Sequence, residues 1–203
     1  MKHLLAFIII ITSQIEISAC DCAFSPKTFM TSIMEYTAEF EVVKMDTLAT
    51  EGIYKYWPLI LTRLKVIKSF NDSIDVDYVW MNNTSGTDCE RGIFPDHIGQ
   101  KYIITGRFIE GKRYDRWIDD SEERNFLYSS TCGKMVLDVE GNNVIGVITK
   151  HNNKKIKEEY DMLMIEDESK ATAYYEEIYN TKHHPDRVQT MTLNEFYKLM
   201  ELR

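Results

Sequence analysis

The sequence predicts a mainly β domain, either a small closed barrel or a sandwich, followed by a helical C-terminal segment. Three observations predict it. Five short segments between residues 36 and 130 read as strands, three of them with apolar and polar residues alternating over part or all of their length; polar turn signals separate them, and Lys and Glu become more frequent after Lys150. Short strands at this spacing are typical of barrels and sandwiches.

The five predicted strands cover residues 36–45, 59–68, 74–81, 101–109 and 125–130. The third alternates most strictly, which places Ile74, Val76, Tyr78 and Trp80 on one face and Asp75 and Asp77 on the other. Gly106 interrupts the fourth strand. A glycine inside a strand is typical of a bulge or of a sharp bend at a barrel corner.

The remaining elements follow the strands. Residues 139–149 predict a hairpin with Gly141-Asn142 at its tip. Residues 158–165, 168–179 and 190–202 predict helices. In the last of these, Thr192 is the expected N-cap and Glu195 its capping-box partner. The apolar face of that helix consists of Leu193, Phe196, Tyr197 and Met200. Residues 150–203 are thus a helical appendage, packed on the barrel of residues 20–149 or on a partner.

Residues 1–19 have the features of a signal peptide. Lys2 and His3 precede an apolar run of eight residues at 4–11, too short to cross a bilayer. Cleavage is expected between Ala19 and Cys20, which makes the protein exported and allows disulfides. Ile17-Ser18-Ala19-Cys20 also resembles the bacterial lipobox. Cys20 is therefore either a disulfide partner or a lipid attachment point.

Composition and motifs exclude several classes of function. The formal net charge is −8, and removing residues 1–19 leaves it unchanged because Lys2 and Glu16 cancel. An acidic chain repels phosphate backbones, so no nucleic acid is expected as a partner, and a membrane only if Cys20 is lipidated. The sequence holds no Gly-x-Ser-x-Gly, P-loop or His-Glu-x-x-His motif, which predicts a protein that is not an enzyme and needs no cofactor. His183-His184-Pro185-Asp186 is read as a polar turn rather than a metal site.

Together, the cysteines and strands resemble the netrin-like N-terminal domain of the tissue inhibitors of metalloproteinases. The matching features are Cys20-x-Cys22 at the mature N-terminus, the strand at 36–45, the segment 64–69, Cys89 followed by Gly92, the strand at 102–108 before Glu110-Gly111, and Ser130-Thr131-Cys132. The resemblance covers about residues 20–135. The family's further cysteines in this domain, and its six-cysteine C-terminal domain, have no counterpart here.

The resemblance implies a five-stranded OB-fold barrel with disulfides Cys20–Cys89 and Cys22–Cys132; sequence alone allows three connectivities for four cysteines. It also implies a function. The α-amino group and carbonyl oxygen of Cys20 would bind the zinc of a partner metalloprotease at its open coordination position. The side chain of Asp21 would enter the protease's specificity pocket, where the family favours a small or hydroxylated side chain. The chain needs no metal of its own for this.

The lipobox supports a second hypothesis, a bacterial envelope lipoprotein in which the same barrel binds a protein or a ligand. A diacylated Cys20 carries a thioether sulfur and cannot join a disulfide. Cys22 and Cys132 could still pair, but Cys89 would be left as an odd thiol, which is unusual in an exported protein.

Overall fold

The computed structural model describes residues 27–48, 59–70, 74–83, 97–112, 124–129, 135–150, 152–181 and 183–202. The elements, in chain order, are α2 (Phe29–Ser32), β1 (Tyr36–Leu48), β2 (Leu59–Ser69), β3 (Tyr78–Asn83), β4 (Lys101–Lys112), β5 (Arg124–Tyr128), β6 (Val136–Glu140), β7 (Asn143–Gly146), α3 (Asn153–Glu166), α4 (Glu168–Asn180), β8 (Gln189–Thr192) and α5 (Leu193–Glu201). None of the helices in these residues has the length and hydropathy needed to span a bilayer.

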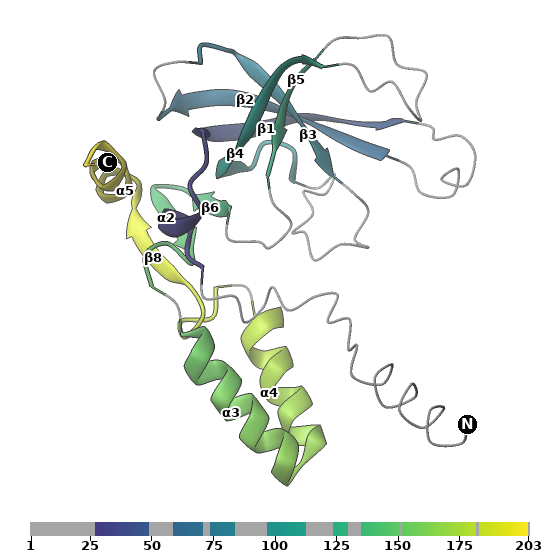
Figure 1. Ribbon diagram of the computed structural model, residues 1–203, viewed down its shortest axis with the longest axis vertical. Helices are drawn as coiled ribbons and strands as arrows, with labels where there is room; N and C mark the ends of the chain where they lie inside the picture. The colour runs from purple at the N-terminus through teal and green to yellow at the C-terminus, as the bar shows by residue number, and fades with distance from the viewer. Residues whose placement is uncertain are drawn as a thin grey trace, which may run out of the picture.

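The first five strands form a closed barrel with an OB-like strand order. The order is β1-β2-β3-β5-β4, and β1 pairs with β4 to close the circle. All neighbours are antiparallel except β3 and β5, which pair in parallel at Trp80 and Phe126. The predicted mainly β fold with a closed barrel is therefore confirmed. Figure 1 shows the barrel as one body, with the α3–α4 pair at the opposite end of the molecule.

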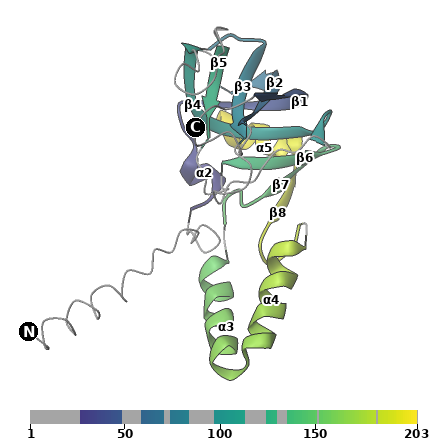
Figure 2. The ribbon, with the colours of Figure 1, turned by 90° about the vertical axis from the view of Figure 1, so that its right-hand side faces the viewer.

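Strand β4 belongs to the barrel and also carries the three strands that extend the same eight-stranded sheet beyond it. Its residues Lys101–Ile104 pair with β6 on one side while residues 101–106 pair with β1 on the other. From β6 the sheet continues through β7 to β8 (Figure 2). Beyond Gly106, β4 pairs with β5 instead. Gly106 thus stands where the strand changes partners, at the corner that the sequence pattern indicated.

Successive side chains of β4 point to opposite faces, so the strand contributes to two separate hydrophobic cores. Tyr102 and Ile104 point into the barrel, whereas Ile103 joins a second core outside it. The barrel core consists of Tyr36, Ala38, Phe40, Val42, Leu64, Val79, Met81, Tyr102, Ile104 and Leu127. The second consists of Phe29, Ile103, Leu137, Val139, Val144, Ile148 and Phe196, which come from α2, the β4-β6-β7 sheet with the residues after β7, and α5. A strand buried on both faces reads as a continuous apolar run, as at residues 102–104.

Two local predictions need correction. Tyr78 and Trp80 do not share the inner face with Ile74 and Val76, because Tyr78 is 37% exposed while Val79 is fully buried. A bend at Asp77 shifts the alternation by one residue before β3 begins. The helix predicted from residue 190 begins at Leu193, since residues 189–192 form β8 against β7. Four residues are too few for a period to separate strand from helix.

The other predicted elements are present. The hairpin turns at Gly141-Asn142, where Gly141 has φ +58°. Helix α3 begins at Asn153, five residues before the predicted start at 158, and α4 begins at Glu168, as predicted. Thr192 caps α5 with the Glu195 capping box. The side chains Leu193, Phe196, Tyr197 and Met200 face the second core, as expected.

Gly106→Ala is expected to lower the free energy of unfolding by about 1–3 kcal/mol, the cost of overpacking a core. An added Cβ would lie 2.6 Å from the carbonyl oxygen of Tyr128, and that backbone atom cannot move without disturbing the β4–β5 pairing. Urea unfolding measures the change. Arg107→Ala, at the exposed neighbouring position, is the control and should stay within about 0.5 kcal/mol. Equal effects at both positions would contradict the packing argument.

Candidate functional site

The start of the mature chain is the site that the sequence predicts, and Cys20, Asp21, Cys22, Cys89 and Cys132 all lie outside the described residues. The description begins at Lys27, seven residues after Cys20. The two disulfides, the zinc-binding role of Cys20 and its lipidation thus stay predictions. What the structure describes is the segment that follows this start, from Lys27 onward.

Helix α2 anchors the N-terminal segment to the body of the protein. The backbone N–H groups of Phe29 and Met30 donate to the carbonyl oxygens of Val147 and Ile148, at 2.7 and 3.0 Å. Phe29 is fully buried and packs edge-on against Phe196 of α5, with ring centroids 5.9 Å apart. Thr28 caps the helix reciprocally with Thr31. These contacts fix residues 28–31 in position against the second core.

Buried hydroxyl groups also attach the segment after α2 to strand β4. Thr105 of β4 accepts a hydrogen bond from the Met34 N–H and one from the Thr37 hydroxyl, both at 2.8 Å. The Thr105 N–H donates to the Met135 carbonyl oxygen at 3.0 Å. Thr105 thus contacts both the segment after α2, through its side chain, and the segment before β6, through its peptide N–H. In sequence, Cys22 precedes the first of these segments and Cys132 precedes the second.

A buried carboxylate joins the C-terminal helix to the barrel. Glu39 of β1 is only 2% exposed, and its Oε2 accepts a hydrogen bond from the Tyr197 hydroxyl of α5. Lys101 Nζ lies 3.8 Å from its other oxygen, and Lys68 Nζ lies 3.7 Å from the centre of the Tyr197 ring. Burial of the phenol, and then the hydrogen bond and charge of Glu39, raise the pKa of Tyr197 well above its ordinary 10.

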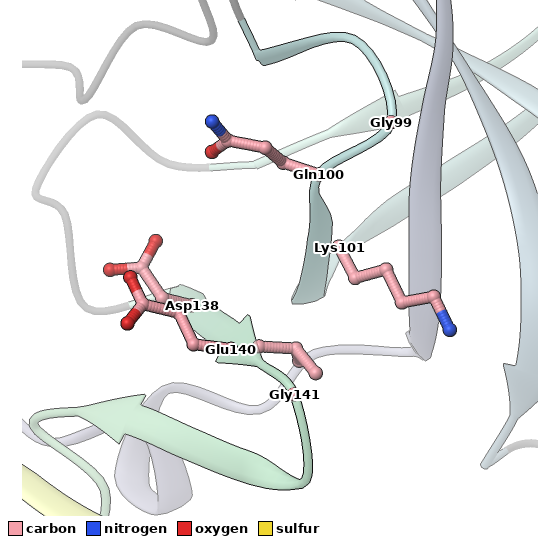
Figure 3. Close-up of a pocket in the computed structure, with 7 residues that line it drawn as sticks. Gly99, Gln100, Lys101, Asp138, Glu140 and Gly141 are labelled. Carbon is pink, nitrogen blue, oxygen red and sulfur yellow. The ribbon is translucent and has the colours of Figure 1, made fainter.

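A polar pocket of about 450 Å³ opens where β4 and β6 begin to pair. Its lining consists of Gly99, Gln100, Lys101, Asp138, Val139, Glu140 and Gly141. Figure 3 shows the carboxylates of Asp138 and Glu140 side by side, with the Gln100 amide facing them across the gap and the Lys101 ammonium turned away. The acidic wall can accept a cationic or hydrogen-bond-donating group.

His183 lies against this acidic wall. Its Nε2 is 2.9 Å from Glu140 Oε1, and its Nδ1 is 4.0 Å from Asp138 Oδ2. Residues 183–187 form a turn, as predicted, but His183 adopts φ +67°, which non-glycine residues seldom do. The contact holds the chain that returns from α4 to β8. No cluster of three or more His, Cys, Asp or Glu that could hold a metal occurs in the described part of the chain.

Sequence reasoning missed Glu39 and the role of His183. Glu39 alternates with Ala38 and Phe40, so the pattern places it on the outer face of β1. It is buried because α5 covers that face. The one hint in the sequence is the Tyr197 hydroxyl, a polar tip on an otherwise apolar helix face, but it lies 158 residues away. His183 and Glu140 are 43 residues apart in sequence, and no local pattern connects them.

Comparison of the chain with protein-family models, with curated proteins and with solved structures found no match.

Tyr197→Phe should lower the free energy of unfolding by about 1.5–3 kcal/mol, because a buried carboxylate loses its donor. Since folding raises the Tyr197 pKa, its contribution is complete below about pH 10 and is lost as the pH rises through the folded-state pKa. The parent should therefore lose stability more steeply than Tyr197→Phe above that pH. Urea unfolding across the pH range measures both effects. Tyr78→Phe, at an exposed phenol, is the control; if it behaves like Tyr197→Phe, the network is not responsible.

Replacing His183 separates its side-chain contact from its backbone strain. His183→Asn loses the imidazole but tolerates positive φ, so a loss of about 0.5–1.5 kcal/mol is expected. His183→Val also places a β-branched residue at positive φ, which should cost at least about 1 kcal/mol more. Thermal unfolding ranks the three proteins. Equal stability of the two variants would show that the strained conformation is not retained.

Proposed function

We propose that the chain is an exported, non-enzymatic protein-binding module of the netrin-like type. Its most specific activity would be inhibition of a zinc metalloprotease through the mature N-terminus at Cys20. The observation that carries the proposal is the closed barrel with the OB-like order β1-β2-β3-β5-β4, with an N-terminal segment anchored on its shared strand β4. The family resemblance of the cysteines comes from sequence and is independent of the strand order.

The anchor supports the proposed chemistry. Eight residue steps separate Thr28 from Cys20, and a chain of that length spans at most about 28 Å. A terminus at Cys20 would therefore stay near the anchored helix α2. Disulfides from Cys20 and Cys22 would shorten this tether further. A terminus held in place loses little freedom when it docks, which strengthens binding without new contacts. The Cys20 amine and carbonyl oxygen would then occupy the open coordination position of the partner's zinc.

Asp21 sets the expected selectivity. Moving a carboxylate into an apolar pocket is costly unless the pocket supplies a partner. The proposed target is thus a protease whose specificity pocket contains a cationic or strong donor group. A small or hydroxylated residue at position 21 would fit apolar pockets better.

The N-terminal extension test addresses the proposal directly. The protein with a free Cys20 amine should inhibit at least one protease in a panel of zinc metalloproteases, and a form with one additional residue before Cys20 should not, because an amide nitrogen cannot donate its lone pair to zinc. Inhibition constants measure the difference, and circular dichroism confirms that both forms are folded. Asp21→Thr should extend inhibition to proteases with apolar pockets. Equal inhibition, or none, by the free and extended forms across the panel would remove the inhibitor proposal.

The lipobox-like Ile17-Ser18-Ala19-Cys20 favours a second candidate, an envelope lipoprotein that uses the same barrel as a binding module. Two or three acyl chains would anchor such a protein stably. The intact mass of the protein from its own host distinguishes the two candidates, since acylation adds the mass of the lipid at Cys20. A Cys20→Ser variant that is as soluble as the parent, with no mass added to either, would eliminate the lipoprotein.

A further inference from the structure

Helices α3 and α4 are an insertion in the connection between two paired strands. Strands β7 and β8 run antiparallel, with Asn143 opposite Thr192 at one end and Gly146 opposite Gln189 at the other. Residues 147–188 lie between them in sequence. A turn of a few residues is enough to join such strands, so the pairing itself does not require the helices. Figures 1 and 2 show both helices projecting from this end of the sheet, away from the barrel.

The two helices pack mainly on each other. Three of their apolar side chains are buried, and none of these belongs to the barrel core or to the second core: Ile156, Ala171 and Ile178. The rings of Tyr160 in α3 and Tyr175 in α4 meet edge-on, with their centroids 5.9 Å apart. The Tyr174 hydroxyl of α4 donates a hydrogen bond to the Glu159 carboxylate of α3. The hairpin thus has apolar and polar contacts of its own.

The turn between the helices is also fixed from within. Asp167 ends α3 by donating its N–H to the Leu163 carbonyl oxygen at 2.7 Å. Its carboxylate accepts hydrogen bonds from the Ser169 and Lys170 N–H groups and so caps α4. A negative charge at the N-terminal end of a helix is favourable. These bonds all lie inside the hairpin, and the sheet takes no part in them.

Exposed polar contacts join the two ends of the hairpin. The Gln189 Oε1 accepts hydrogen bonds from the Thr149 and Lys150 N–H groups, at 2.7 and 2.9 Å. The Asn152 side chain donates to the Asp186 carbonyl oxygen at 2.9 Å. Asparagine is a favoured N-cap, yet Asn152 precedes α3 without a side-chain capping bond. We call Thr149, Lys150, Asn152, Asp186 and Gln189 the neck. Water competes for exposed groups of this kind, so each bond contributes little.

We infer that the α3–α4 hairpin is a hinged arm, which folds as a cooperative unit separate from the barrel and its sheet and turns as one body about the neck. The contacts at the neck can break without exposing either core. Units of this kind open at a lower free energy than the whole protein. The hinge lies beyond Val147 and Ile148, whose carbonyl oxygens hold α2, so the anchor of α2 stays in place when the arm turns. The inference does not depend on the proposed function.

Two matched substitutions on either side of the neck test whether the arm is a separate unit. Ile178 of α4 and Ile148 of the second core are 3% and 0% exposed. In the full chain, Ile178→Ala should speed amide hydrogen exchange in α3 and α4 by roughly tenfold or more and leave exchange in β4 and β7 unchanged. Ile148→Ala should do the reverse. Acceleration of both regions by either variant would overturn the inference. If an alanine variant does not fold, Ile178→Val and Ile148→Val make the same comparison with smaller changes.

Residual dipolar couplings of the backbone amides test the hinge. In the parent, the amides of the arm and those of the barrel should require two different alignments, and the arm should be the less ordered. Asn152→Ala and Gln189→Ala should each lower the order of the arm further, because each removes a contact of the neck. Thr190→Ala, at an exposed position of β8 beside the neck, is the control and should behave like the parent. One alignment that fits both parts, or neck variants with the arm ordered as in the parent, would overturn the hinge.

Discussion

The pairing of β4 with three other strands is the constraint on which the rest of the structure depends. Its first half is hydrogen-bonded to β1 and β6, and its second half to β5. The β1 pairing closes the barrel, and the β6 pairing attaches the sheet on which α2 and α5 pack. Gly106 allows the change because it has no side chain where the Tyr128 backbone approaches. Breaking this one strand would open the barrel and separate the two cores together.

The first and the last described elements, α2 and α5, pack on the outside of the same strand. Phe29 from the N-terminal segment and Phe196 from the last helix meet in the second core beside Ile103. Glu39 and Tyr197 add a buried hydrogen bond between β1 and α5. A buried polar pair is costly to break, because the carboxylate would remain without a donor. The anchor of the N-terminal segment therefore depends on the C-terminal helix, although the two are more than 150 residues apart in sequence.

The sequence predicts the parts of this fold that rest on local patterns. Short apolar-rich segments between polar turns, three of them alternating, located the five barrel strands. Turn residues located the Gly141-Asn142 hairpin, and the Thr192–Glu195 capping box located α5. Local patterns do not reveal β8, since residues 189–192 form a strand by pairing with the edge of β7. Nor do they show that Glu39 is buried, because the helix that covers it, α5, is more than 150 residues away in sequence. A bend at Asp77 shifts the alternation of buried and exposed side chains by one residue, although the sequence pattern there is regular. The predicted site residues Cys20, Asp21 and Cys22 rest on sequence and resemblance, and the structure describes only the segment that follows them, from Lys27 onward.

The proposed function depends most on the predicted attachment of Cys20 and Cys22 to the barrel. Mass mapping of peptides from the protein isolated from its own host and digested without reduction tests this directly. The account predicts two linked pairs, Cys20–Cys89 and Cys22–Cys132, with a free α-amino group on Cys20. A thioether-linked lipid on Cys20, a Cys20–Cys22 link, or free thiols at these positions would contradict it.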